Sequence, residues 1–556
     1  MLGFEASLAL LAGLGLLSAR LISFAWLDDI PHVMDEIAYE LQARMYAVGR
    51  IAGEVPSPLS AFNQWFVEDR GQRYGIFPPG WPAVLALGHL LGASRWVNPL
   101  LHGFTVLAVG HLGRRIGGER VGQLSALLYG FCPQALLMAA SSMSHTLAAL
   151  LAVLSLSPCV SWSLMPMQQR MQMRAVQVAA HAARAGLALG WLAATRPLCG
   201  AVIGVCCAAV LLRELARGGL WLAHAWALPA LCVPVLAFLA YNHALTGDAL
   251  LLPQTRYFES HIPPIAGEEF RYAPHCNSLG FGVEHGCEIT YGSFGHTPQK
   301  ALVNTGRNLI TWLSLAAGGG MLALAALCAL LLRSTRSMAA LLLAPAALVV
   351  PAYALYWYVG TCYGARFYHV ALPFGLLASA LGLTALYQRS RSGKLSALVL
   401  GLGAAAFALN ISTRARAELE DRYWATDARF RRLVEEYQGP PALVLVAFRT
   451  QRLKKPPDSV TGTGVFGWSN GIRILSAQQM NRPLLDGPIV FARYHPALIP
   501  AVQRSFPERK LLVYVMADHS KDDAIVPHEQ LHLQLLDPHS PVENFPGLVL
   551  RDTSGR

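Results

Sequence analysis

Apolar residues occur along this chain in separate blocks of about helix length, divided by short polar breaks rich in arginine or in glycine and proline. An apolar helix needs about 20 residues to cross the roughly 30 Å of hydrocarbon in a bilayer. The pattern therefore predicts about eleven membrane-spanning helices. They are expected near residues 8–26, 97–113, 121–140, 146–164, 176–195, 198–212, 220–241, 309–332, 338–358, 367–387 and 395–411.

The breaks between the blocks alternate in charge. Basic residues gather in the connectors 114–120, 170–174, 213–217, 333–336 and 389–394. By the positive-inside rule these connectors are cytoplasmic. This places the N-terminus in the cytoplasm and two long loops, 28–82 and 242–308, on the outer side.

Composition narrows the classes of protein that remain. Hydrophobic residues make up 54% of the 556 positions and charged residues 14%, which excludes a soluble multi-domain enzyme of this size. The net charge of +11 follows from the basic connectors, and no basic stripe interleaved with aromatic residues accompanies it. We therefore expect membrane lipids as partners and no nucleic acid.

The chain changes character after residue 413. Strand-like runs at 442–448 and 511–516 are separated by turns rich in proline and glycine, and an amphipathic piece covers 424–437. The fold class predicted is an α-helical polytopic membrane protein with a C-terminal soluble α/β domain. The transmembrane domain covers residues 1–413 and the soluble domain 414–556, which an odd number of spans leaves outside the cell.

Two adjacent acids, Asp35 and Glu36, follow the first apolar block. These acids place carboxylates at the membrane surface, directly outside the first predicted span, where they are candidates for a functional site. The alternative is that both acids only begin a helix whose dipole favours negative charge there. Together with His32, at spacing i, i+3 and i+4, they leave open a divalent metal. No other cofactor is indicated.

Two arginines stand in outer turns that otherwise carry almost no positive charge. They are Arg196, before Pro197, and Arg366. An arginine near hydrocarbon is costly unless it pairs with a carboxylate, a carbonyl or a phosphate. We therefore predict that both bind the phosphate of an anionic lipid headgroup, with Arg73 as a third candidate; an internal ion pair is the alternative.

Further polar and aromatic residues of the outer loops and turns are candidates for substrate binding. They are Tyr74, His145, Tyr257, His285, His296, Tyr363 and Tyr368. Cys276 and Cys287 share one of these loops and are close enough in sequence to form a disulfide if the loop faces an oxidising compartment.

Several short motifs occur in a fixed order on the predicted outer side. They are Asp35-Glu36, the run Tyr74-Gly75-Ile76-Phe77-Pro78-Pro79-Gly80-Trp81, Thr195-Arg196-Pro197, Tyr241-Asn242 with Thr246-Gly247-Asp248, and Tyr363-Gly364-Ala365-Arg366-Phe367-Tyr368 with Pro373. On these motifs the chain, up to about residue 412, resembles the membrane-embedded GT-C class of glycosyltransferases. It resembles in particular the family 39-like bacterial relatives of protein O-mannosyltransferases and of the aminoarabinose transferase that modifies lipid A.

The resemblance implies a protein of the bacterial inner (plasma) membrane that transfers a sugar from a polyprenyl-phosphate donor. The acceptor would be a lipid, glycan or protein of the envelope, and the anomeric carbon would be inverted. Asp35, with Glu36 second, would be the catalytic base that accepts the proton of the attacking hydroxyl. Arg366, aided by Arg196 or Arg73, would neutralise the phosphate. Two other classes remain: a transporter or flippase whose arginines bind an anionic solute, and a non-catalytic sensor.

Overall fold

The computed structural model describes most of the first 390 residues and the centre of the C-terminal part. The described residues are 3–215, 225–258, 278–283, 285, 295–316, 318, 320–358, 360, 363–389, 398, 401, 405, 428, 439–448, 477–478, 480–516, 524–527 and 548–549.

The first part of the chain is helical. Its elements are α1 Phe4–Ala25, α2 Met34–Ala47, α3 Leu59–Phe62, β1 Val67–Glu68, β2 Tyr74–Gly75, α4 Gly80–Leu90, η1 Ser94–Trp96, α5 Val97–Gly117, α6 Glu119–Gly130, α7 Pro133–Ala140, α8 His145–Leu164, α9 Met167–Gln172, α10 Ala175–Thr195, α11 Pro197–Leu215, α13 Ala227–Thr246, α14 Pro253–Phe258, α16 Pro298–Ala316, α17 Met321–Leu331, α18 Arg336–Ala354, η2 Arg366–Ala371 and α19 Leu372–Arg389.

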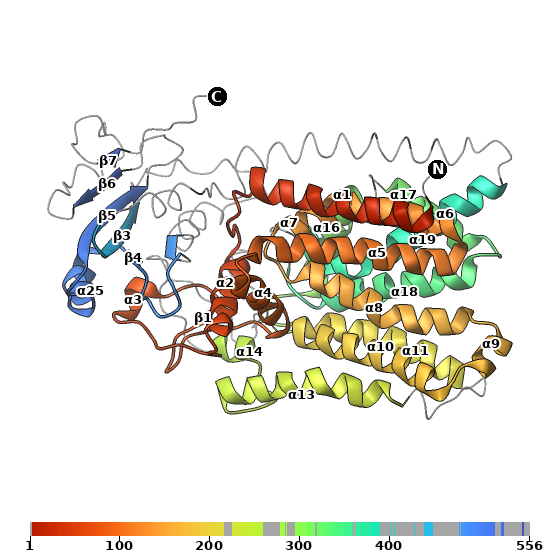
Figure 1. Cartoon of the computed structure of the whole chain (residues 1–556), viewed down its shortest axis with the longest axis horizontal. Coiled ribbons are helices and arrows are strands. Elements are labelled where there is room, and N and C mark those ends of the chain that lie inside the picture. Colours follow the sequence, from red (N-terminus) through yellow and green to blue (C-terminus); the bar gives the residue numbers. More distant parts are fainter. Residues whose placement is uncertain are drawn as a thin grey trace.

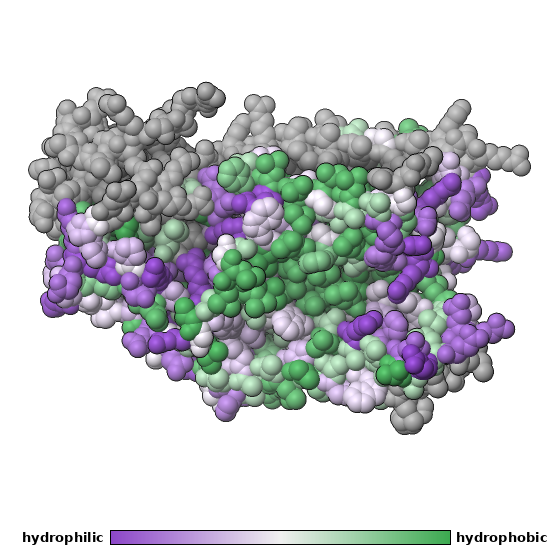
Figure 2. Space-filling view, in the orientation of Figure 1, coloured by the Kyte–Doolittle hydropathy of each residue, from purple (hydrophilic) through white to green (hydrophobic). Residues whose placement is uncertain are grey.

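The long helices lie side by side in one bundle, and an apolar band covers the bundle between two polar ends (Figures 1 and 2). Exposed leucines on α1, such as Leu17 and Leu21, belong to this apolar surface. In the described part of the chain, five helices are long and apolar enough to cross a membrane, or up to seven if each bent pair is one span. The chain is thus a multi-pass membrane protein, and the expected total of about eleven spans is not confirmed.

Two predicted spans are broken in the structure. The block 121–140 forms α6 and α7, which meet at an angle of 56°. Pro133 begins α7 and has no N–H to continue the hydrogen bonds of α6. The block 309–332 forms α16 and α17, bent by 96°, and Gly320 precedes α17 with a φ of +96°, a conformation that favours glycine. The predicted span 395–411 lies almost wholly outside the described residues.

Small residues allow the helices to approach closely. A Cβ added to Gly186 or Gly190 of α10 would lie 2.0 Å from the Ala227 carbonyl oxygen or 2.4 Å from that of Leu231, both on α13. Membrane helices have no hydrophobic driving force between them in lipid, so close packing of this kind stabilises their contact.

One end of the bundle carries the short elements of the outer loops. Figure 1 places α2, α4 and α14 there, and α9 at the opposite end. The hairpin of β1 and β2 lies at the same end as α2 and pairs Val67 with Gly75. The positive-inside rule predicts that this end is extracytoplasmic, and the orientation stays a prediction.

Beyond this end lies a five-stranded sheet (Figure 1). Its strands are β3 Ala442–Phe448, β4 Ile489–Arg493, β5 Lys510–Met516, β6 Ala524–Pro527 and β7 Leu548–Val549, with η4 Pro496–Leu498 and α25 Ile499–Ser505 between β4 and β5. The order is β4-β3-β5-β6-β7; β3 runs parallel to β4 and β5, and the last two pairings are antiparallel. The strands β3 and β5 occupy the runs predicted from the sequence, whereas 424–437 falls largely outside the described residues.

Both faces of this sheet are buried, and each face also contacts the first outer loop. Val444 and Phe491 pack on one face with Ile30, while Leu443 packs on the other with Phe62. The C-terminal sheet is therefore docked against the end of the bundle that carries α2.

Candidate active site

A cavity of about 280 Å³ opens at the end of the bundle that carries α2. Segments far apart in the sequence form its walls. They contribute Val33, Met34, Asp35 and Tyr39; Phe66, Phe77 and Pro78; Thr195, Arg196, Pro197 and Leu198; Leu252, Gln254, Thr255, Phe258 and Leu279; Tyr353, Tyr356, Trp357 and Tyr358; and Arg366 and Phe367. Aromatic rings form much of the wall, and the charged groups are few.

Asp35 and Arg366 face each other across this cavity. The Arg366 Nη2 atom lies 3.4 Å from Oδ1 and 3.5 Å from Oδ2 of Asp35. The aspartate side chain keeps 18% of its surface exposed and the arginine 6%. A turn in which Tyr363 and Gly364 have φ of 54° and 66° precedes η2, which begins at Arg366.

Arg196 enters the same cavity from the break between α10 and α11. Pro197 cannot donate a backbone hydrogen bond, and Arg196 has the extended φ and ψ of −145° and 91°. Its guanidinium donates to the Ser144 hydroxyl at 3.2 Å and to the Tyr353 hydroxyl at 3.3 Å. It also lies 5.1 Å from the centre of the Phe367 ring.

The described lining of the cavity has an excess of positive charge. Asp35 is its carboxylate, and Arg196 and Arg366 are its guanidinium groups. An arginine that is largely removed from water is stabilised by a phosphate or carboxylate, which accepts hydrogen bonds from two of its nitrogens. The cavity is thus suited to an anion beside apolar and aromatic groups.

Glu36 has a different environment from its neighbour Asp35. Its Oε2 atom accepts hydrogen bonds from the backbone N–H groups of His32 and Val33 at 2.9 and 3.1 Å and from the Tyr363 hydroxyl at 2.9 Å. Its Oε1 atom accepts one from the Ser142 N–H at 2.6 Å. Burial raises the pKa of the Glu36 carboxyl, and these donors oppose that shift. Glu36 does not line the cavity, and its contacts fix the start of α2.

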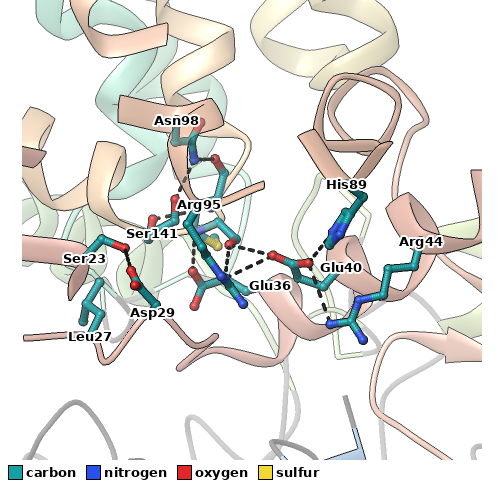
Figure 3. A network of polar contacts seen from close by, with 12 residues as sticks. Ser23, Leu27, Asp29, Glu36, Glu40, Arg44, His89, Arg95, Asn98 and Ser141 are labelled. Atoms are coloured by element: carbon teal, nitrogen blue, oxygen red, sulfur yellow. Dashed lines mark hydrogen bonds and ion pairs between the residues drawn. The ribbon is translucent and has the colours of Figure 1, made fainter. Parts of the chain in front are cut away.

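Glu40, one turn further along α2, is the centre of a polar network (Figure 3). It contacts His89 of α4 at 2.7 Å, Arg95 of η1 at 3.2 Å and the Ser142 hydroxyl at 3.0 Å. Burial alone would raise the pKa of this carboxyl, but Arg95, His89 and Arg44 hold it well below its usual value. The network ties α2 to α4 and to the turn before α8.

We expect Glu40→Gln to lower the free energy of unfolding by about 1–3 kcal/mol, because it leaves the partly buried Arg95 and Arg44 without their carboxylate. The folded-state pKa is below the unfolded one, so the carboxylate stabilises the fold above about pH 4.5, and this contribution is lost as the pH falls through the folded pKa. Thermal unfolding of the purified protein at pH 7 and pH 3 measures both effects. The exposed Glu5→Gln is the matched control and should change little; equal stability of the two variants would contradict the network's role.

The run of proline, glycine and tryptophan that leads into α4 packs against the turn before α8 and against the end of α10. The indole N–H of Trp81 donates to the Ser142 carbonyl at 2.9 Å, and that of Trp191 donates to the Gly80 carbonyl at 3.2 Å. A Cβ on Gly80 would lie 2.4 Å from the Thr195 hydroxyl oxygen and 2.8 Å from the Ala194 carbonyl oxygen. Glycine here allows α4 to touch the end of α10.

Gly80→Ala is therefore expected to push α4 away from α10 and to move Arg196. We expect the affinity for a phosphate-bearing ligand of this cavity to fall by about tenfold, since misplacing one contact costs of the order of 1.4 kcal/mol. Binding of a polyprenyl phosphate by the purified protein measures the effect. Gly13→Ala, where an added Cβ meets nothing within 4 Å, is the control. Wild-type affinity in Gly80→Ala would show that this contact does not position Arg196.

Other residues singled out in the sequence lie outside this cavity. Arg73 is paired with Asp69 at 3.2 Å and donates to the Phe62 carbonyl at 2.9 Å. Tyr74 is buried and donates to the Leu245 carbonyl at 3.4 Å. These contacts hold the outer loop in place, and neither side chain is part of the cavity's lining.

The side chains of the remaining candidates do not line the cavity and have other contacts. The Tyr257 hydroxyl accepts the Phe66 N–H at 3.2 Å, and His296 contacts the Ala354 carbonyl at 3.0 Å. His285 contacts the Ser278 hydroxyl, and Tyr363 donates to Glu36. His145 and Tyr368 are buried near the Phe367 and Trp312 rings. Cys276 and Cys287 lie outside the described residues.

Several aromatic residues of the cavity were not among the sequence candidates, and four of them lie close together in the sequence. They are Tyr353, near the end of α18, and Tyr356, Trp357 and Tyr358, which follow that helix. Tyr353 stacks on Phe367 with a centroid distance of 4.8 Å. The signal in the sequence is the cluster Tyr353 to Tyr358, which is typical of an aromatic belt at the membrane surface. A membrane-surface belt and a cavity wall give the same pattern in the sequence, so the sequence did not show that this cluster lines a cavity.

The three residues proposed as metal ligands point in different directions. His32 contacts the Leu27 carbonyl, Asp35 faces Arg366, and Glu36 accepts the donors described above. Among the residues that the structure describes, no group of three or more histidines, cysteines and acids is placed to hold a metal ion.

No protein-family model matches this chain, and no curated protein matches its sequence. Solved structures that it resembles include ArnT from Cupriavidus metallidurans bound to undecaprenyl phosphate, with 13% identity, 90% of this chain and 92% of that chain covered, and a TM-score of 0.47. An oligosaccharyltransferase from Archaeoglobus fulgidus in complex with Zn and sulfate follows, with 14% identity, coverage of 83% and 61%, and a TM-score of 0.44.

Proposed function

We propose that the chain is an inverting glycosyltransferase that moves a sugar from a polyprenyl-phosphate donor to an envelope acceptor on the extracytoplasmic face of the membrane. The observation that carries this proposal is the pair of Asp35 and Arg366 in one cavity that has a second arginine and aromatic walls. The Asp35 carboxylate, which can accept the proton of a hydroxyl, therefore lies beside guanidinium groups that can bind a phosphate.

The reaction would be a single displacement. The acceptor hydroxyl attacks the anomeric carbon from the face opposite the phosphate, and its proton passes to Asp35. The bond between the anomeric carbon and the phosphate oxygen breaks, and the polyprenyl phosphate leaves with the bonding electrons. Arg366 and Arg196 stabilise the negative charge that grows on this phosphate, and an interaction that strengthens in the transition state accelerates the step.

The ion pair seen in the structure is compatible with this sequence of events. Its separation of 3.4 Å is longer than the 2.7–2.9 Å of a good charge-assisted hydrogen bond. A donor phosphate would therefore replace Asp35 as the partner of Arg366 and leave the carboxylate available to the acceptor. Apolar lining residues such as Leu198, Leu252 and Trp357 would accommodate the first isoprene units of the donor.

The test is transfer by purified protein reconstituted in lipid vesicles. Polyprenyl-phosphate sugars carrying a radiolabelled sugar are incubated with the protein and with lipid, glycan and peptide acceptors. A labelled product supports the proposal. Movement of the labelled lipid across the bilayer without any transferred product would instead identify a flippase, and donor binding without either result would identify a sensor.

A further inference from the structure

The ring of Phe367 lies close to both guanidinium groups of the cavity. Its centre is 5.1 Å from Cζ of Arg196 and 5.4 Å from Cζ of Arg366. A guanidinium within about 6 Å of a ring centre is attracted by the negative charge on the face of the ring. A single side chain therefore has a favourable contact with two cations that come from segments distant in the sequence.

The two guanidinium groups repel each other, and the cavity offers little charge to offset this. Asp35 is the carboxylate of the described lining, and it pairs with Arg366. The hydrogen bonds that Arg196 donates within the described residues go to neutral groups, the hydroxyls of Ser144 and Tyr353. Repulsion between cations grows where water is excluded, because the effective dielectric constant falls. An aromatic ring lowers this cost without a charge of its own, so it does not repel a phosphate as a second carboxylate would.

The aromatic wall of the cavity holds the Phe367 ring in place. Tyr353 stacks on it with the planes 10° apart and the centres 4.8 Å apart, and Tyr358 meets it at 71° with the centres 4.3 Å apart. Both tyrosines also contact the arginines. The Tyr353 hydroxyl accepts from Arg196 at 3.3 Å, and the centre of the Tyr358 ring lies 5.2 Å from Cζ of Arg366. Stacked and edge-to-face aromatic pairs have defined geometries, so these neighbours fix the position of the ring.

We propose that Phe367 is a positioning residue that fixes the distance between the guanidinium groups of Arg196 and Arg366, so that both bind one phosphate. The inference rests on the proposed function, in which this cavity binds the phosphate of a polyprenyl donor. Phe367 acts through the two arginines and takes no part in making or breaking bonds. Without the attraction of the ring, repulsion would move the guanidinium groups apart, and a phosphate would be bound by one of them at a time.

Fluorinated phenylalanines at position 367 test this role, because fluorine draws electrons from the face of the ring and changes its size little. The full chain is prepared with mono-, di- or trifluorophenylalanine at this position. The Kd is then measured for farnesyl phosphate and for farnesol, which lacks the phosphate. We expect the Kd for farnesyl phosphate to rise at each step and to be at least about tenfold higher with the trifluoro ring, while the Kd for farnesol stays constant.

Phe77 is the matched control. It lines the same cavity, but its ring packs on the rings of Tyr39 and Phe66 at 4.6 and 5.5 Å. The same series at position 77 should leave the Kd for farnesyl phosphate unchanged. In the series at position 367, an equal rise for farnesol and farnesyl phosphate would show that the ring serves only as an apolar wall. An unchanged Kd for both would show that packing alone positions the arginines, and either result overturns the proposal.

Sugar transfer by the same variants separates this inference from the proposed function. If the Kd for farnesyl phosphate rises along the series but the wild type transfers no sugar to any acceptor, the role of Phe367 is supported and the proposed function fails. If the wild type transfers sugar and the Kd stays constant along the series, only the role of Phe367 fails. A wild-type chain that binds farnesyl phosphate no more tightly than farnesol contradicts both.

Discussion

Replacing Asp35 with Asn is expected to lower the rate of sugar transfer by about 10²- to 10⁴-fold, the usual contribution of a general base. Asn is of nearly equal size but cannot accept the proton of the acceptor hydroxyl. Affinity for the donor should not fall, because Asn no longer competes with the phosphate for Arg366. The measurement is kcat for transfer together with the Kd for undecaprenyl phosphate.

Asp248→Asn is the matched control for this experiment. Asp248 lies on an exposed outer turn, accepts the Leu250 N–H at 2.9 Å and does not line the cavity. We expect its transfer rate to equal that of the wild type. Full activity in Asp35→Asn would remove Asp35 as the base, whereas a loss of both transfer and donor binding would show that the substitution disturbs the cavity instead.

The second large effect is expected for Arg366→Gln. Removing this guanidinium takes away positive charge that stabilises the leaving phosphate. The rate of transfer should therefore fall by about 10²- to 10³-fold, the loss that is typical when one hydrogen-bond donor is removed from the oxyanion hole of an enzyme. Donor binding should weaken as well, by a smaller factor, because Arg196 remains in the cavity. Both quantities are measured with the same donor and acceptor as for Asp35.

Arg307→Gln, an exposed arginine of α16, controls for the loss of one positive charge near the membrane. It should retain wild-type rate and affinity. If Arg366→Gln transfers sugar normally, the phosphate is not bound where the ion pair lies, and the proposed orientation of the donor is wrong. Lys at position 366 should restore part of the rate, since it keeps the charge but not the planar fork of the guanidinium.

The sequence predicted that Asp35, Arg196 and Arg366 lie on one side of the membrane, and the structure places all three in the lining of one cavity. The position of Asp35 after the first apolar block and the break at Pro197 are local features, and the structure places both beside Arg366. It also predicted the strand runs 442–448 and 511–516. It did not predict the bends at Pro133 and between α16 and α17, because hydropathy averages across a short break.

The sequence by itself determined that the chain is a multi-pass membrane protein, and it predicted that the acids and arginines lie on one side of the bundle. Both conclusions follow from the length of the apolar blocks and from the charges between them, which are properties of short segments. Only the tertiary structure decided which of two adjacent acids faces the cavity. Asp35 and Glu36 differ by about 100° around α2, and the N–H of Ser142 and the hydroxyl of Tyr363, both distant in sequence, hold Glu36 away from the cavity.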